Sequence, residues 1–209
     1  MLDMDSTFIQ QEVIDLLARH AGVGEQVAAI TEKSMRGEID FRRSLLDRVA
    51  LLKGLNVSVF EKVRSEIFLS VGAKKMVDSL HIAGHTVGVV SGGFANVIAP
   101  VLEDAHVDYF QANVLEVEGG FLTGNTVGPI IDRVAKGLYL QELAAKLSIP
   151  LDRTVAIGDG ANDLGMMELA GLSIAFNAKP IVQAAATAAI TNGDLFDVIQ
   201  IMEEHFSTE

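Results

Sequence analysis

The sequence lacks several features, and each absence excludes certain kinds of structure or function. It contains no cysteine, which excludes disulfide bonds and thiolate chemistry and fits a reducing cytoplasm. Although 49% of the residues are hydrophobic, no apolar run approaches the roughly 20 residues that a membrane-spanning helix needs. No secretory signal sequence precedes the first charged residues, so we expect a cytoplasmic protein with no membrane partner. No G-x-x-x-x-G-K-[ST] motif occurs, which excludes a P-loop nucleotidase.

Positive charge is also scarce. Lys and Arg together number 16, against 28 Asp and Glu, which gives a formal net charge of −12. This balance argues against nucleic acid as a partner. Any phosphate-bearing substrate must then be held by local cations or by a metal ion. The five histidines show no metal-ligand spacing, and we interpret them as surface or packing residues: His20, His81, His85, His106 and His205.

The chain length and the helical patterns in the first third of the sequence predict one domain with an insertion. A length of 209 residues suits one domain, and a monomer and a homodimer both remain open. Four amphipathic helical patterns follow a very short first strand, at about 10–21, 24–35, 41–52 and 57–67. No strand pattern appears until after Gly84. We therefore predict that residues 11–71 form a helical cap, a candidate lid, and that residues 1–10 and 72–209 form the core.

From residue 72 onward, strand patterns alternate with helical patterns. Continuous apolar runs predict buried parallel strands at 86–90 and 154–157, with further strands at 109–112, 172–176 and, weakly, 189–190. Residues 113–117 and 121–127, joined through Glu118-Gly119-Gly120, predict a β-hairpin. This alternation predicts an α/β fold: a doubly wound, mostly parallel, Rossmann-like sheet with a helical cap and a small hairpin.

Two carboxylates stand at the very start of the chain, in Asp3-Met4-Asp5-Ser6-Thr7. Residues i and i+2 of a strand point to the same side, so both acids can gather at the carboxyl end of the first strand. Ligands bind at that edge in open α/β sheets. Such a pair can hold a divalent cation, or act as nucleophile and acid/base. The alternative is an Asp-rich turn with a Ser/Thr helix cap.

A second acidic loop, Gly158-Asp159-Gly160-Ala161-Asn162-Asp163, follows the strand at 154–157. Together with Asp3 and Asp5 it makes a four-aspartate cluster. So many close carboxylates repel one another and shift pKa values upward, and a bound Mg²⁺ removes the problem. The alternative is a Gly-Asp turn in which Asn162 or Asp163 caps the following helix. Both can hold, with Asp163 orienting the loop.

Two further positions could bind an oxyanion. Ser91-Gly92-Gly93 ends the strand at 86–90 and offers a hydroxyl and backbone N–H groups; an ordinary strand-to-helix turn is the alternative. No G-x-S-x-G surrounds Ser91, which excludes a serine nucleophile of that type. Lys136 starts a helix, where the helix dipole disfavours a cation, which hints at another reason for its placement. The alternative for Lys136 is a solvated surface residue.

Taken in order, these motifs resemble the four motifs of the haloacid dehalogenase superfamily. The run Val90-Ser91-Gly92-Gly93-Phe94, the helical insertion and the Asn162-Asp163 ending resemble the members that hydrolyse O-phospho-L-serine. The resemblance covers essentially the whole chain. It implies a Mg²⁺-dependent phosphomonoesterase that performs the last step of serine biosynthesis.

The resemblance also implies roles for the acidic residues. Asp3 would attack the phosphoester and form an aspartyl-phosphate. Asp5 would protonate the leaving oxygen and then deprotonate the attacking water. Mg²⁺ would be bound by the Asp3 carboxylate, the Asp5 backbone carbonyl and Asp159, with Asp163 supporting the metal site. Phosphoryl transfer needs this kind of alignment and charge neutralisation.

Substrate binding is implied in the same way for two groups of residues. The phosphoryl oxygens would be held by Ser91, Gly92, Lys136 and Asn162. The amino and carboxylate groups of phosphoserine would be held by Glu12 and Arg48, with Met35 and Phe41 lining the pocket. Arg binds a carboxylate in a bidentate fork, which suits a zwitterion clamp. From the residues alone, Glu12 is a first-turn acid and Arg48 a solvated face residue.

One departure and two competing functions remain. The superfamily has a full apolar strand before the first motif, where this sequence has Met1 and Leu2. We expect a form with about five more apolar residues there to be more stable. The competing functions are a phosphotransferase acting on another small hydroxy amino acid such as homoserine, and a phospho-accepting switch. The acid at Asp5 argues against the switch.

Overall fold

The computed structural model describes residues 1–191 and 193–207 of the chain. Its centre is a sheet of parallel strands. Within it, β1 (Gly88–Phe94) pairs with β2 (Tyr109–Glu118), and β4 (Val155–Gly158) pairs with β5 (Leu172–Phe176), which pairs with β6 (Ala188–Ile190). Leu2 makes parallel bridges to both Val89 and Ile157 and so joins the two halves. The predicted doubly wound parallel fold is confirmed, and the first two residues lie at its centre.

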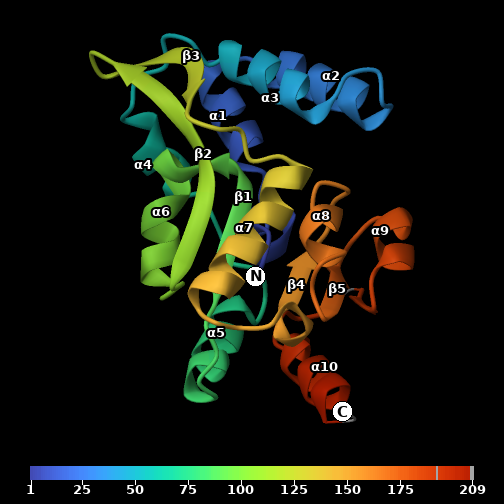
Figure 1. The fold of residues 1–209 in the computed structure, drawn as a ribbon. Coiled ribbons are helices and arrows are strands. Elements are labelled where there is room, and N and C mark those ends of the chain that lie inside the picture. The colour runs from blue at the N-terminus through green and yellow to red at the C-terminus, as the bar shows by residue number, and fades with distance from the viewer. Residues whose placement is uncertain (192, 208–209) are drawn as a thin grey trace.

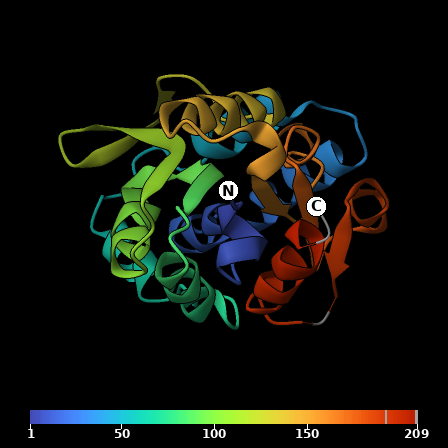
Figure 2. The same cartoon turned by 60° about the horizontal axis from the view of Figure 1, so that its bottom comes forward.

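Helices cover both sides of this sheet, as expected where every strand is buried. They are α5 (Ala73–Ile82), α6 (Ala95–Asp104), α7 (Arg133–Lys146), α8 (Leu164–Met167), α9 (Pro180–Ala185) and α10 (Asp197–Phe206). Figure 2 shows α7 on one side of the N-terminus and α5 and α10 on the other. Among the described residues, no helix is long and apolar enough to cross a membrane.

The predicted cap contains four helices: α1 (Val13–Ala21), α2 (Gly24–Met35), α3 (Phe41–Ala50) and α4 (Val59–Arg64). In Figure 1, α2 and α3 lie at the top of the molecule, α1 lies below them, and α4 lies to the left of β2, where it packs against α6. The ends of α1 and α3 follow from the sequence. Gly22 takes the left-handed conformation that ends α1, at φ 71°, and the Asp40 side chain accepts a hydrogen bond from the Arg43 amide at 2.7 Å to cap α3. The chain enters and leaves the cap side by side, because Ile9 bridges Leu69 in antiparallel fashion. The division at 10/11 and 71/72 stays a prediction.

The strand predictions need two corrections. The predicted strands 109–112 and 113–117 are one continuous strand, β2, because this stretch contains no Gly or Pro that would interrupt it. Its first half pairs with β1, and its second half pairs with β3 (Phe121–Val127) in the predicted hairpin. The strand predicted at 86–90 instead runs from Gly88 to Phe94, with a register shift between Ser91 and Phe94. A bulge of this kind bends a strand next to a site.

The hairpin is also tied to the cap. The Gly54 amide donates to the Leu122 carbonyl at 2.8 Å, and the Leu122 amide donates to the Leu55 carbonyl at 2.9 Å. A third bond runs from the Val57 amide to the Gly120 carbonyl at 3.0 Å. The connection between α3 and α4 therefore pairs with β3, and the cap is fastened to the core at a point away from its two linkers.

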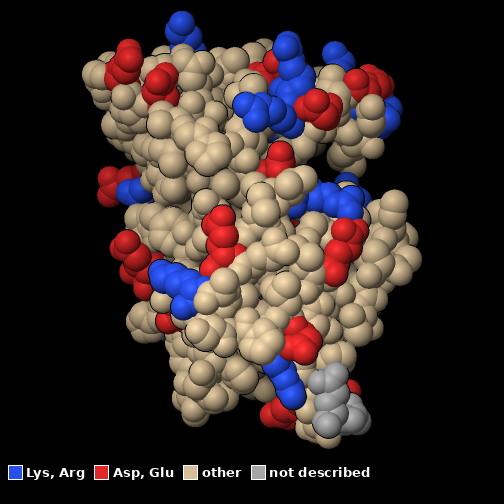
Figure 3. Space-filling view, in the orientation of Figure 1, with Lys and Arg blue, Asp and Glu red and all other residues tan. Residues whose placement is uncertain are grey.

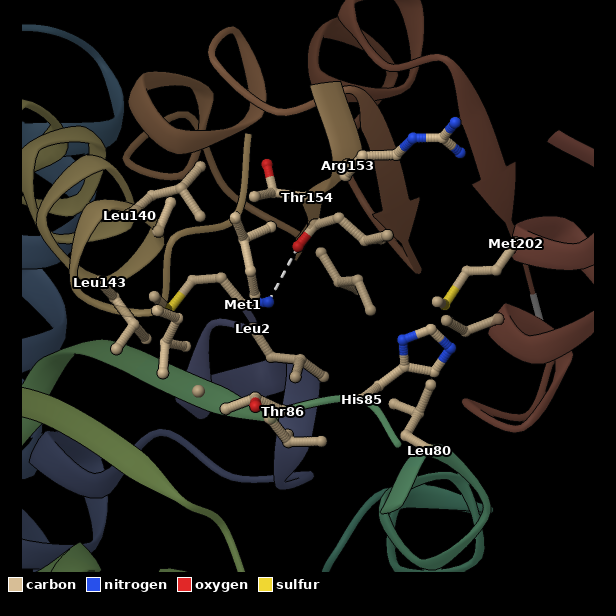
Figure 4. A pocket seen from close by; sticks show the side chains of 18 of the residues that line it. Met1, Leu2, Leu80, His85, Thr86, Leu140, Leu143, Arg153, Thr154 and Met202 are labelled. Atoms are coloured by element: carbon tan, nitrogen blue, oxygen red, sulfur yellow. Dashed lines mark hydrogen bonds between the residues drawn. The ribbon is translucent and has the colours of Figure 1, made fainter. Parts of the chain in front are cut away.

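A pocket lies beside the N-terminus, between β1 and β4 (Figure 4). The Met1 amino group donates to the Val155 carbonyl at 2.8 Å, and the Leu2 amide donates to the Gly88 carbonyl at 2.8 Å. The walls are mostly apolar and come from helices on both sides of the sheet: Leu80, Leu140, Leu143, Val198 and Met202. The space before Met1 is therefore a slot between two strands.

Candidate active site

The first acidic loop leaves the centre of the sheet and turns sharply. The Asp3 amide donates to the Ile157 carbonyl at 2.9 Å, which keeps Asp3 in line with the strand and buries its side chain. The turn follows in Met4–Phe8, where Ser6 has a φ of 58°. A non-glycine residue in this left-handed region costs about 1–3 kcal/mol and is typical of functional sites. The turn sends the chain from Asp3 directly into the cap.

Lys136 lies at the centre of the site, fully buried near the start of α7. Its Nζ donates to Asp3 Oδ1 at 2.5 Å and to Asp163 Oδ1 at 2.6 Å. Burial opposes its charge, but the Asp163 and Asp3 carboxylates outweigh burial and raise the pKa of Lys136. The interpretation of Lys136 as a solvated surface residue is therefore wrong. Its cation joins two loops that lie far apart in the sequence.

Three carboxylates converge beside Lys136. One oxygen from each of Asp3, Asp159 and Asp163 lies within 4.8 Å of the other two. Burial and then the Asp163 carboxylate raise the pKa of Asp3 well above its usual range, and Lys136 only partly offsets them. The same two causes raise the pKa of Asp159 to about 7. Carboxylate oxygens are the ligands that Mg²⁺ and Ca²⁺ prefer, so this donor set fits a hard divalent cation.

Asp163 also holds its own loop in place. Its Oδ2 accepts hydrogen bonds from the Asp159 amide at 3.1 Å and the Gly160 amide at 2.9 Å. These two bonds fix the Asp163 carboxylate to the backbone of its own loop. Asn162 is half-buried on the same loop. A Cβ at Gly160 would lie 2.3 Å from Asn162 Oδ1, so a larger residue there would displace the Asn162 amide from its present position.

Asp5 lies apart from the three clustered carboxylates. Its Oδ2 accepts a long hydrogen bond, 3.3 Å, from the Val13 amide, and its Oδ1 is buried without a recorded partner. Burial, then the charges of Glu12 and Asp3, raise the pKa of Asp5 well above its usual range. A raised pKa favours the protonated form, which is the form that a general acid needs.

The Ser91 loop closes the opposite side of the site. The buried Ser91 Oγ accepts from the Gly93 amide at 2.8 Å. Both glycines allow close approach, because a Cβ at Gly93 would lie 3.1 Å from Asp5 Oδ2 and one at Gly92 would lie 3.0 Å from Cζ of Phe41. Phe41 begins α3, so the cap lies directly against the loop.

Glu12 and Arg48 face the site from the cap side. Glu12 stands just before α1 and accepts from Ser6 Oγ at 2.7 Å. Desolvation lowers the pKa of Arg48, and the charges of Glu12, Asp15 and Asp5 partly offset that shift. The interpretation of Arg48 as a solvated face residue is therefore wrong. Met35 is 65% exposed at the end of α2, and the structure does not bring it into this group.

Two polar residues in the site were not predicted. Buried Asn113 donates through Nδ2 to the Gly92 carbonyl at 2.8 Å and accepts from the Ile131 amide at 2.9 Å, so it sets the shape of the Ser91 loop. Thr7 Oγ1 donates to Asp159 Oδ1 at 3.2 Å. A polar residue inside a strand pattern was the available signal for Asn113. Thr7 gave none beyond its place in the first motif.

Comparison with known proteins places this geometry in a family. The family model described as haloacid dehalogenase-like hydrolase matches residues 1–168. The chain belongs to this family. The predicted resemblance and the enzyme class, a hydrolase, are therefore confirmed.

Several similar proteins are named phosphoserine phosphatase. The chain is 52% identical over 204 residues to a phosphoserine phosphatase of Streptococcus thermophilus, covering 98% of this chain and 95% of that protein. It is 50% identical to a phosphoserine phosphatase of Streptomyces coelicolor, covering 97% of this chain and 49% of that longer protein. A solved phospho-aspartyl intermediate analogue of phosphoserine phosphatase is 42% identical, with a TM-score of 0.90 over 96% of each chain. A substrate-bound phosphoserine phosphatase complex has the same identity and TM-score, covering 96% of this chain and 95% of that chain.

Proposed function

We propose that the protein is a Mg²⁺-dependent phosphomonoesterase that hydrolyses O-phospho-L-serine to L-serine and phosphate, the last step of serine biosynthesis. The observation that carries the proposal is the buried Lys136 ammonium, which joins Asp3 to Asp163 beside Asp159. This arrangement provides a nucleophile, a cation for the phosphoryl group and a carboxylate set for a metal. The names of the similar proteins support the choice of substrate.

In the first step, an Asp3 oxygen attacks phosphorus and the bond from phosphorus to the serine oxygen breaks. Asp5 donates its proton to that oxygen, so serine leaves as a neutral alcohol. In the second step, Asp5 accepts a proton from water, the water oxygen bonds to phosphorus, and the bond to Asp3 breaks. One residue serves as acid and then as base, and its raised pKa suits both tasks.

A divalent cation would be held by the Asp3 carboxylate, the Asp5 backbone carbonyl and Asp159, with Asp163 supporting that loop. It would neutralise charge on the phosphoryl oxygens. The same oxygens would be bound by Ser91, Gly92, Lys136 and Asn162.

The cap would recognise the serine part of the substrate. Glu12 would bind the substrate ammonium and Arg48 its carboxylate, with Phe41 closing the pocket over Gly92. Met35 stays a predicted pocket residue at the exposed end of α2. We further propose a cytoplasmic monomer or homodimer whose partner is the small phosphomonoester alone. A phosphotransferase acting on homoserine is not favoured, because the similar proteins are named as phosphatases.

The test is phosphate release from phosphoserine, phosphothreonine and an aryl phosphate, with Mg²⁺ and with a chelator, and without an acceptor alcohol. We expect Mg²⁺-dependent release that is fastest from phosphoserine. Release that requires an added alcohol would favour the phosphotransferase. A folded protein that releases no phosphate from any of the three would reject the proposal.

A further inference from the structure

Two buried side-chain oxygens among the described residues have no hydrogen-bond partner: Asp5 Oδ1 and Ser44 Oγ. A buried polar atom left unpaired costs free energy, so each such atom in a native structure needs an explanation. Asp5 belongs to the candidate active site, where a substrate would meet it. Ser44 is only 1% exposed, and it has no role in the function proposed above.

Ser44 lies on the face of α3 that closes over the site. It follows Phe41 by three residues and precedes Arg48 by four, and residues at these spacings share one face of a helix. Phe41 contacts the Ser91 loop, and the charges of Glu12 and Asp5 act on Arg48. The burial of Ser44 does not remove it from the site, because Ser91 and Lys136 are equally covered beneath the cap.

The guanidinium of Arg48 is held against the turn that carries Ser44. Its Nε donates to the Ser44 backbone carbonyl at 3.2 Å, and its Nη1 donates to Thr31 Oγ1 at 3.4 Å. Thr31 donates its own proton to the Val27 carbonyl at 3.1 Å, so its hydroxyl is free to accept from Arg48. In the described part of the chain Nη2 has no recorded partner. Nη2 is therefore the nitrogen of Arg48 that is left to bind an anion, one helical turn after Ser44 on α3.

We propose that the Ser44 hydroxyl donates a hydrogen bond to the substrate carboxylate that Arg48 binds. This inference rests on the proposed function and adds to it a specificity-determining residue. The hydroxyl supplies a donor where the clamp needs one, since Glu12 takes the ammonium at the other end. A partner on the substrate would also explain why the hydroxyl bonds to no group of the protein.

The test uses opposite effects on stability and on affinity. Ser44→Ala should leave the melting temperature unchanged or higher, because it removes an unpaired buried hydroxyl. It should raise KM for phosphoserine roughly tenfold, which corresponds to about 1.4 kcal/mol, with little change in kcat. KM for O-phosphoethanolamine, which lacks the carboxylate, should not change. Ser44→Thr keeps the hydroxyl and should restore most of the affinity.

Ser34→Ala in α2 is the matched control, because it makes the same change in helix propensity at a half-buried position outside the proposed substrate clamp. A lower melting temperature for Ser44→Ala than for Ser34→Ala would overturn the inference in favour of a structural hydroxyl. Equal losses on phosphoserine and phosphoethanolamine, or an unchanged KM on both, would overturn it too. A wild-type protein that hydrolyses aryl phosphate but not phosphoserine would instead reject the proposed function, and the inference with it.

Discussion

The core and cap sides of the candidate site are built differently. In the core, Lys136 is fully buried and bonded to two carboxylates, and Asp163 accepts from three donors. In the cap, Arg48 is only partly buried, and its two bonds are 3.2 and 3.4 Å long. On the face seen in Figure 3, Lys and Arg side chains are most numerous over the cap helices α2 and α3. Under the proposed function, the residues for the reaction lie on the core side and the residues for recognition lie on the cap helices.

The largest expected effect is on the core side. Asp3→Asn replaces the nucleophile and should abolish turnover on every substrate, because an amide cannot form the acyl-phosphate. Phosphate release from phosphoserine and from an aryl phosphate should both fall to background while the far-UV circular dichroism stays native. Residual rates near wild type would reject Asp3 as the nucleophile.

A smaller and selective effect is expected on the cap side. Arg48→Ala should lower kcat/KM for phosphoserine by roughly a hundredfold, because a charge-assisted bond to the carboxylate is lost. The aryl phosphate, which has no carboxylate, should react nearly as fast as with the wild type. Arg43→Ala, which removes a more exposed arginine from the same helix, is the matched control. Equal losses of kcat/KM on both substrates would mean that the cap does not recognise the serine part of the substrate.

The carboxylate cluster of the core should also make the stability of the protein depend on pH. The pKa of Asp159 is raised to about 7, whereas aspartate in an unfolded chain titrates near about 3.9. Between these values the folded protein binds more protons than the unfolded chain, so stability falls as pH rises from about 4 to about 7. We expect this fall in chelator and a flatter profile with Mg²⁺, measured as melting temperature against pH.

The variant Asp159→Asn distinguishes the titration of Asp159 from that of the other carboxyl groups. In chelator the variant should lose part of the pH dependence, because its side chain no longer ionises. Adding Mg²⁺ should stabilise it less than the wild type, since one carboxylate ligand is gone. A variant with the wild-type slope would show that Asp159 does not titrate in this range.

The smallest effect concerns the slot before Met1 (Figure 4). The Gly88 and Val155 carbonyls bond to Leu2 and Met1, so the amides of the same two residues point into the slot. About five added apolar residues would pair with both strands and pack against the apolar walls. We expect the melting temperature to rise by ~2–4 °C for each kcal/mol gained. An extension of equal length rich in Gly and Ser is the control, and equal melting temperatures would contradict the prediction.

The sequence by itself predicted most of the helices and strands and the side-chain types that the candidate site contains. Apolar runs predicted the parallel strands, and the aspartates after two of them predicted a carboxylate cluster, because strand ends share an edge and residue type sets ligand chemistry. Only the tertiary structure decided burial and partners. It showed that Lys136 is covered, that Asn113 shapes the Ser91 loop and that the Ser44 hydroxyl stands unpaired. The sequence states which chemical groups each side chain carries. The hydrogen-bond partners of those groups depend on packing, which brings together segments that lie far apart along the chain.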